Sequence, residues 1–156
     1  MEICRVSFFG HRRLLFDEEL DRRIQEMVKE LIRTKEFVEF YVGRNGDFDV
    51  IVASAIKRAQ KIGDRSNNAL ILTLPYPVRD LEYYEAYYDE IVIPTEGTAH
   101  FKAAITKRNE WMVENSELVI ACVQKESGGA YRALRYAEKR GVPVVNLGEE
   151  LPMLPL

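Results

Sequence analysis

Six short apolar runs, separated by stretches with helical periodicity, constrain the fold of this chain more than any other feature. The runs are rich in valine, isoleucine, phenylalanine and tyrosine, and they mostly lack the alternation of apolar and polar residues seen in half-exposed strands. This pattern is typical of strands that are buried on both faces. The runs are Ile3–Phe9, Phe37–Val42, Ala69–Leu74, Glu90–Ile93, Leu118–Val123 and Pro143–Asn146.

Between the runs, apolar residues recur every three or four positions, as they do on the buried side of an amphipathic helix. The expected helices cover about 18–34, 48–62, 80–90, 99–115 and 130–140. Asp17 is placed to cap the first helix, and Gly63 and Gly141 are placed to end the second and the last. Alternating strands and helices predict a Rossmann-like three-layer α/β/α sandwich with a mainly parallel sheet. The length of 156 residues fits a single domain spanning 1–156.

Composition excludes several classes of function. The net charge of −3 argues against a nucleic-acid partner, because such domains usually carry a strong basic excess. Cys4 and Cys122 lie in apolar runs and are interpreted as buried free thiols of a reducing cytoplasm. No motif indicates a metal, a resident cofactor, a GxxxxGK[ST] phosphate loop or a GxSxG elbow. With no signal sequence and no long apolar run, we expect a cytoplasmic protein without a membrane partner.

Ligands of open α/β sheets bind outside the carboxyl ends of the strands, so the segments that follow the runs are the candidate contacts. In Gly10-His11-Arg12, the glycine leaves room for a ligand, and the histidine can donate to an oxygen or change its charge near neutral pH. The segment 43–49, GRNGDFD, opens a helix whose free amides favour negative charge. One carboxylate of this segment, Asp47 or Asp49, can cap the helix and leave the other to accept hydrogen bonds from a ribose or a base.

Two further segments follow buried runs. Pro75 and Tyr76 form a stiff loop with an aromatic ring that suits packing against a base or closing a pocket. Gly128 and Gly129 open the last helix, where the backbone can approach a phosphate closely. Each of these segments is also compatible with a purely structural turn. The Tyr-rich stretch 80–90 favours core packing or a subunit contact over a ligand site.

The segment KRNEWMVENSELVIACVQKESGGAYRALRYAEKRGVPVV resembles the SLOG superfamily, which contains the Lonely-guy phosphoribohydrolases, the DprA DNA-uptake proteins and nucleotide-sensing domains of defence systems. FFGHRRL and YVGRNGDFDVIVASAIKRA are similar to a small bacterial and phage branch with a Gly-His-Arg motif. The resemblance covers about 3–147. It implies a Rossmann-like fold, a nucleotide or nucleotide-derived ligand with its phosphate at the Gly-Gly turn, and a homo-oligomer, with a dimer favoured.

The chain departs from the catalytic form of this motif. In the phosphoribohydrolase branch the turn reads PGGxGTxxE, and a helix arginine and the closing glutamate serve cleavage of an N-glycosidic bond. Arg108 matches the helix arginine, whereas Arg135 stands where the glutamate would be. An oxocarbenium-like transition state needs nearby negative charge, which an arginine cannot supply. Asp47, Glu85, Glu96 and above all Asp49 are the carboxylates that could substitute.

We therefore expect a protein that binds or senses a nucleotide-derived ligand, either ADP-ribose-like or a nucleoside monophosphate, and that is not an enzyme. Arg12, Arg44 and Arg108 would supply positive charge, and Tyr76 or Tyr131 would pack on the base. Two alternatives stay open: a nucleotide N-glycosidase with Asp49 as its carboxylate, and single-stranded DNA binding. The expected ligand contacts are Gly10, His11, Arg12, Gly43, Arg44, Gly46, Asp47, Asp49, Pro75, Tyr76, Arg108, Ser127, Gly128, Gly129 and Tyr131.

Overall fold

The computed structural model describes residues 1–14, 17–63, 66–95, 97 and 100–152. The strands are β1 (Ile3–Gly10), β2 (Phe37–Val42), β3 (Asn68–Thr73), β4 (Glu90–Val92), β5 (Leu118–Cys122) and β6 (Val144–Asn146). The helices are α1 (Glu18–Thr34), α2 (Asp47–Ile62), α3 (Leu81–Tyr87), α4 (Phe101–Glu114) and α5 (Gly129–Arg140), followed by the 3₁₀ turn η1 (Leu147–Glu149). The expected elements are all found, with ends that differ by a few residues at most. Ala99, the expected start of the fourth helix, lies outside the described residues.

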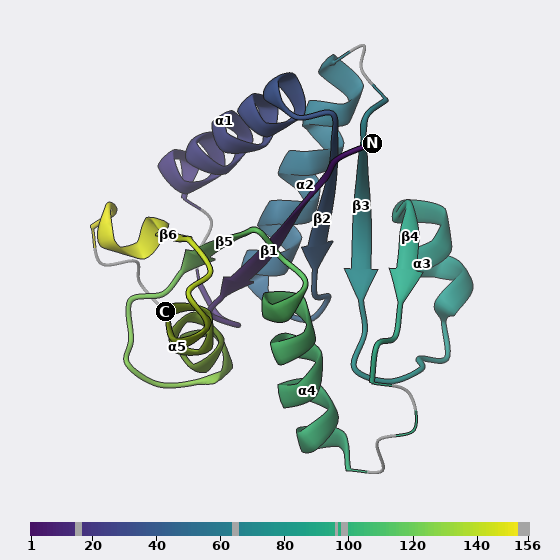
Figure 1. Cartoon of the computed structure of the whole chain (residues 1–156), viewed down its shortest axis with the longest axis vertical. Coiled ribbons are helices and arrows are strands. Elements are labelled where there is room, and N and C mark those ends of the chain that lie inside the picture. The colour runs from purple at the N-terminus through teal and green to yellow at the C-terminus, as the bar shows by residue number, and fades with distance from the viewer. Residues whose placement is uncertain (15–16, 64–65, 96, 98–99, 153–156) are drawn as a thin grey trace.

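The strands pair in parallel in the order β4-β3-β2-β1-β5-β6 (Figure 1). Two apolar clusters cover the two faces of this sheet. One holds the buried sides of α1 and α2, and the other holds those of α4 and α5. Phe8 and Phe9 belong to different clusters because neighbouring side chains of a strand point to opposite faces. The prediction of a Rossmann-like α/β fold is confirmed, and burial on both faces explains why the runs lack alternation.

Local signals set several of the helix ends. Asp17 caps α1, since its Oδ1 accepts a hydrogen bond from the Leu20 amide at 2.9 Å. Gly141 ends α5 in the left-handed conformation with φ of 76°, which glycine adopts without strain. Cys122 is buried and Cys4 is only partly buried, and both are free thiols. None of the described helices is long and apolar enough to cross a membrane.

The strand order creates a switch point beside β1. From β1 the chain moves outward through β2, β3 and β4, then returns to the other side of β1 with β5 and β6. In such sheets the connections diverge at the switch point and leave a crevice at the carboxyl ends of the strands. The loops after β1, β2 and β5 therefore meet at one edge of the sheet.

Gly10 has a packing role that the sequence analysis did not anticipate. A Cβ at this position would lie 2.2 to 2.5 Å from the side-chain atoms of Phe48, in the first turn of α2. Phe48 is completely buried and has no room to move away. The missing side chain of Gly10 therefore allows α2 to start against the end of β1.

We expect Gly10→Ala to lower the free energy of unfolding by about 1–3 kcal/mol, the usual cost of forcing an extra carbon into a packed core. Urea denaturation followed by circular dichroism measures this change. Gly63→Ala is the matched control, because a Cβ there meets a single atom, the Ala59 carbonyl oxygen, at 3.4 Å. Equal stability of Gly10→Ala and the wild type would show that Phe48 does not fix this glycine.

Candidate functional site

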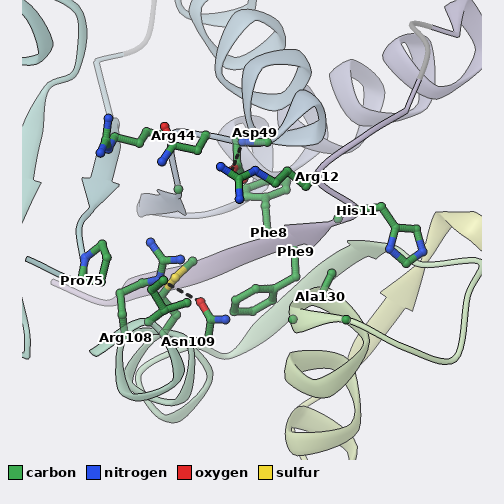
Figure 2. A pocket seen from close by; sticks show the side chains of 18 of the residues that line it. Phe8, Phe9, His11, Arg12, Arg44, Asp49, Pro75, Arg108, Asn109 and Ala130 are labelled. Atoms are coloured by element: carbon green, nitrogen blue, oxygen red, sulfur yellow. Dashed lines mark hydrogen bonds between the residues drawn. The ribbon is translucent and has the colours of Figure 1, made fainter. Parts of the chain in front are cut away.

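A cavity of about 600 Å³ opens at the carboxyl edge of the sheet (Figure 2). Its volume lies within the range of about 300–1,000 Å³ that is usual for small-molecule sites. It is lined by the end of β1, by the loops after β1, β2 and β3, by α4, and by the starts of α2 and α5. The expected contacts that line it are Gly10, His11, Arg12, Gly43, Arg44, Gly46, Asp49, Pro75, Tyr76, Arg108, Gly128 and Gly129.

Three expected contacts lie elsewhere. Asp47 is exposed, and its Oδ2 accepts a hydrogen bond from the Leu14 amide at 2.9 Å. Ser127 is exposed in the turn before α5. Tyr131 packs against the apolar cluster under α5 and lines a second hollow of about 410 Å³ together with Arg135. Tyr76, the other aromatic candidate, lines the main cavity.

Most of the wall that α4 contributes is absent from the contacts expected from the sequence. Phe101, Ile105, Asn109 and Met112 line the cavity beside Arg108. Their spacing of three and four residues places them on one side of the helix. That periodicity is visible in the sequence, but it indicates a buried face and not a ligand-binding one. Phe8, Phe9, Asn45, Ala130 and Arg132 complete the set of lining residues that were not expected.

The loop between β2 and α2 is folded around the carboxylate of Asp49. The Gly46 amide donates a hydrogen bond to Asp49 Oδ2 at 3.1 Å. A Cβ at Gly43 or Gly46 would lie only 3.0 or 3.2 Å from this oxygen, so both glycines allow the close approach. Burial raises the pKa of Asp49, and this effect is opposed by the Gly46 amide, the charge of Arg108 and the Gly43 amide.

The structure decides which aspartate of this loop has which position. Asp49 caps the start of α2 and lines the cavity. Asp47 instead ties two loops together, since its amide donates to the Arg12 carbonyl at 2.8 Å while its carboxylate binds the Leu14 amide. Of the other carboxylates considered, Glu85 is exposed on α3, and Glu96 lies outside the described residues.

Arg108 reaches from α4 to the end of β3. Its Nη1 donates to the Thr73 carbonyl at 2.7 Å, and its Nε donates to Asn109 Oδ1 at 2.8 Å. Within the described part of the chain, no carboxylate lies within 4.0 Å of this guanidinium. Burial lowers the pKa of Arg108, and nearby Asp49 and Tyr76 act in the opposite direction. A partly buried cation without an ion-pair partner favours a ligand that can accept hydrogen bonds from it.

Arg44 is held at the rim of the cavity by α3. Its Nη1 donates to the Tyr84 hydroxyl at 3.1 Å, and the guanidinium carbon lies 5.7 Å from the centre of the Tyr84 ring. These contacts hold the guanidinium in place, and no carboxylate of the described residues lies within 4.0 Å of it. Part of the Tyr-rich stretch therefore positions a residue that lines the cavity.

His11 connects the loop after β1 to the loop after β5. Its Nε2 accepts hydrogen bonds from the Gln124 and Lys125 amides at 3.0 and 3.2 Å. A ring nitrogen that accepts carries no proton, so we assign a neutral His11 with its proton on Nδ1. Burial, and secondarily the charge of Lys125, lowers the pKa of His11, which favours this neutral form.

The start of α5 opens onto the same cavity without a side-chain cap. Gly128 has a φ of 93°, a conformation that side chains rarely adopt. The first intrahelical bond runs from the Arg132 amide to the Gly128 carbonyl, so the amides of Gly129, Ala130 and Tyr131 precede the helical ladder. A Cβ on either glycine would meet no atom within 4 Å. The helix dipole and these amides make an accessible anion site.

The cavity has a charged part rich in arginine and an apolar part. Its described lining holds four arginines, Arg12, Arg44, Arg108 and Arg132, against one carboxylate, Asp49. Pro75, Ile105 and Met112 add an apolar side. Among the residues that the structure describes, no three His, Cys, Asp or Glu side chains gather as metal ligands. The arrangement suits an anion joined to a flat, less polar group.

Solved structures with a similar fold include two kinds of protein. The molybdenum cofactor carrier protein of Chlamydomonas reinhardtii has a TM-score of 0.62 at 17% identity, covering 94% of this chain and 78% of its own. DNA processing protein A (DprA) of Streptococcus pneumoniae has a TM-score of 0.66 at 14% identity, covering 91% of this chain and 49% of its own. DprA of Helicobacter pylori, described with a single-stranded DNA binding mode, has a TM-score of 0.63 at 17% identity, covering 90% of this chain and 63% of its own.

The likeness is one of fold. No family model matches the sequence, and no curated protein matches it. The chain spans about half of one DprA protein and somewhat less than two thirds of the other. The expected membership of the Gly-His-Arg branch stays a prediction. The neighbours and this chain share a Rossmann-like fold, and the resemblance seen in the sequence is confirmed at that level.

Proposed function

We propose that this protein binds a phosphate-bearing small molecule of the nucleotide type at the carboxyl edge of its sheet. The observation that carries the proposal is the uncapped start of α5, which opens into a cavity whose described lining holds four arginines and one carboxylate. The amides of Gly129 and Ala130 would receive the phosphate, and Arg12 and Arg132 would neutralise it. The apolar side of the cavity, with Tyr76, would pack on a ring.

The similar structures widen the set of candidate ligands. A fold neighbour carries the molybdenum cofactor, so this cofactor joins ADP-ribose and nucleoside monophosphates as a ligand to test. We propose a binding or sensing role and not an enzymatic one, since Arg135 offers no carboxylate. Arg135 lines the second hollow and not the main cavity. Its Nη1 lies 3.5 Å from Oε1 of Glu138, which is also on α5. The cytoplasmic location and the dimer stay predictions from the sequence.

Hydrolysis of an N-glycosidic bond is a second candidate, and Asp49 is the observation that favours it. This carboxylate faces the cavity, and its pKa is raised by burial, as in many catalytic acids. One of its oxygens is already held by the Gly46 amide. Chromatography for free base, released from nucleoside monophosphates, separates turnover from binding. If Asp49 is catalytic, the Asp49→Asn variant should no longer release free base.

Single-stranded DNA binding is favoured by the arginine-lined cavity and by the DprA neighbours. The net charge of −3 and a cavity of small-molecule size speak against it. A gel shift at low and moderate salt decides, because affinity that comes from phosphate contacts falls steeply as salt rises.

A thermal-shift screen tests the proposed function directly. We expect a rise in the melting temperature with at least one of AMP, GMP, ADP-ribose, NAD, cyclic dinucleotides and the molybdenum cofactor. A ligand at about 100 times its Kd stabilises the folded state by about 2.7 kcal/mol. The corresponding nucleosides, which lack phosphate, serve as controls. No shift with any phosphate-bearing compound would contradict the proposal.

Arg132 and Arg135 provide a matched pair on one helix. Both are exposed, but only Arg132 belongs to the lining of the main cavity. We expect Arg132→Gln to weaken the phosphate-bearing ligand about tenfold, the worth of one charge-assisted hydrogen bond at the low end of about 1.5–3 kcal/mol. Arg135→Gln should leave the Kd unchanged in the same titration. Equal effects of the two substitutions would indicate long-range attraction and not a phosphate site.

The neutral His11 predicts a pH dependence of stability. Because the pKa of His11 is lower in the folded state, this side chain is protonated in the unfolded chain at pH values where it is still neutral in the folded protein. Its stabilising contribution is therefore present above the unfolded pKa of about 6.5 and is lost as pH falls through the lower folded pKa. We expect the free energy of unfolding to fall more steeply between pH 7.5 and 5.5 in the wild type than in His11→Gln. His100→Gln, which changes an exposed histidine, should retain the wild-type slope.

A further inference from the structure

We propose that Asp49 and Arg108 recognise the edge of a ring that presents N–H donors next to a carbonyl oxygen, as guanine does. The inference rests on the proposed function and specifies the far end of the same ligand. Pterins carry the same amino and oxo groups, so the shared chemistry is the ring edge and not one named compound.

Each of the two side chains has a hydrogen-bonding group left over. Asp49 uses Oδ2 for the Gly46 amide, and Arg108 uses Nε and Nη1 for Asn109 and Thr73. Among the described residues, no side chain is hydrogen-bonded to Asp49 or to Arg108 Nη2, although the Gly43 amide also acts on the Asp49 carboxylate. In Figure 2 the two side chains extend from opposite sides of the cavity, Asp49 from the start of α2 and Arg108 from α4.

These opposite charges share one cavity without forming an ion pair within 4.0 Å. Both are partly buried and hydrogen-bonded to neighbouring groups, but neither has a partner of opposite charge within 4.0 Å among the described residues. A phosphate placed here would satisfy Arg108 but would be repelled by Asp49. A neutral group that accepts from Arg108 and donates to Asp49 satisfies both side chains at once.

The sheet order separates this pair from the phosphate site. α5 follows β5, Asp49 follows β2, and Arg108 binds the last residue of β3, while β1 lies between β5 and β2. The pair is thus two to three strand spacings from the start of α5, or about 10–14 Å. An extended nucleoside monophosphate covers such a distance from its phosphate to the edge of its base. Asp49 is therefore assigned to the ring, which is one of the two contacts, ribose or base, that the sequence left open.

The surroundings of the pair suit a flat ring. Pro75, Ile105 and Met112 offer apolar surface next to Arg108, and Asn109 fixes the guanidinium through its Nε. Guanine brings two N–H groups to Asp49 and a carbonyl oxygen to Arg108. Adenine has one amino group and a ring nitrogen as the acceptor beside it. The pair therefore favours the amino-oxo edge.

Calorimetric titration with GMP, AMP, IMP, XMP and 6-hydroxymethylpterin tests the assignment. We expect GMP to bind more tightly than AMP by about tenfold to a hundredfold, the discrimination of a two-bond base contact. In Asp49→Asn, the amide oxygen retains the Gly46 bond and Nδ2 replaces Oδ1. This variant should weaken GMP and strengthen XMP, which has a carbonyl where guanine has its amino group. Asp47→Asn, outside the cavity lining, should keep the wild-type order.

The outcomes separate this inference from the proposed function. If 6-hydroxymethylpterin binds and no purine nucleotide does, the result supports recognition of the amino-oxo ring edge and identifies a pterin as the compound that carries it. Equal affinities for GMP and AMP would overturn the ring assignment while leaving phosphate binding intact. The same holds if 2′-deoxy-GMP binds more weakly than GMP by as large a factor as AMP does. If none of these compounds, ADP-ribose or pyrophosphate binds the folded protein, the proposed function itself fails.

Discussion

The pairing of β1 with both β2 and β5 is the constraint on which the rest of the structure depends. A central parallel strand is covered on both faces, so the second half of β1, from Val6 to Phe9, is buried, and polar groups collect in the loop that follows it. Because the chain leaves β1 in one direction and returns on the other side, the loops after β1, β2 and β5 meet. The cavity is a consequence of that topology, and its chemistry depends on a few polar side chains in those loops.

The loops are held by interactions that use up some polar groups and leave others free. Asp47 binds the loop after β1 through its amide and its carboxylate, and His11 binds two amides of the loop after β5. Asp49 uses one oxygen to cap α2. The amides at the start of α5 have no comparable partner among the side chains that the structure describes. The site is therefore rigid in its supports and open at the groups that a ligand would meet.

The sequence predicted the fold well because its signals were local. Apolar runs, the Asp17 cap and the Gly141 stop depend on residues close together in the chain, and each was confirmed. The site was harder because side-chain direction depends on packing. Nothing in GRNGDFD says which aspartate turns inward, and only the packing of α5 takes Tyr131 away from the cavity. Gly10 was interpreted as leaving room for a ligand, and the sequence could not reveal that the side chain of Phe48 fills the space beside it.

The distribution of charge limits what the cavity can select. The chain as a whole carries a net charge of −3, whereas the described lining of its cavity holds four arginines and one carboxylate. Long-range attraction toward nucleic acid is then weak, and affinity must come from short-range contacts inside the cavity. One carboxylate among four arginines makes the cavity less suited to a simple polyanion, because Asp49 repels it. The arrangement instead favours a ligand with one anionic end and one neutral end that donates hydrogen bonds. The cavity then discriminates between ligands by their hydrogen-bonding groups as well as by their charge.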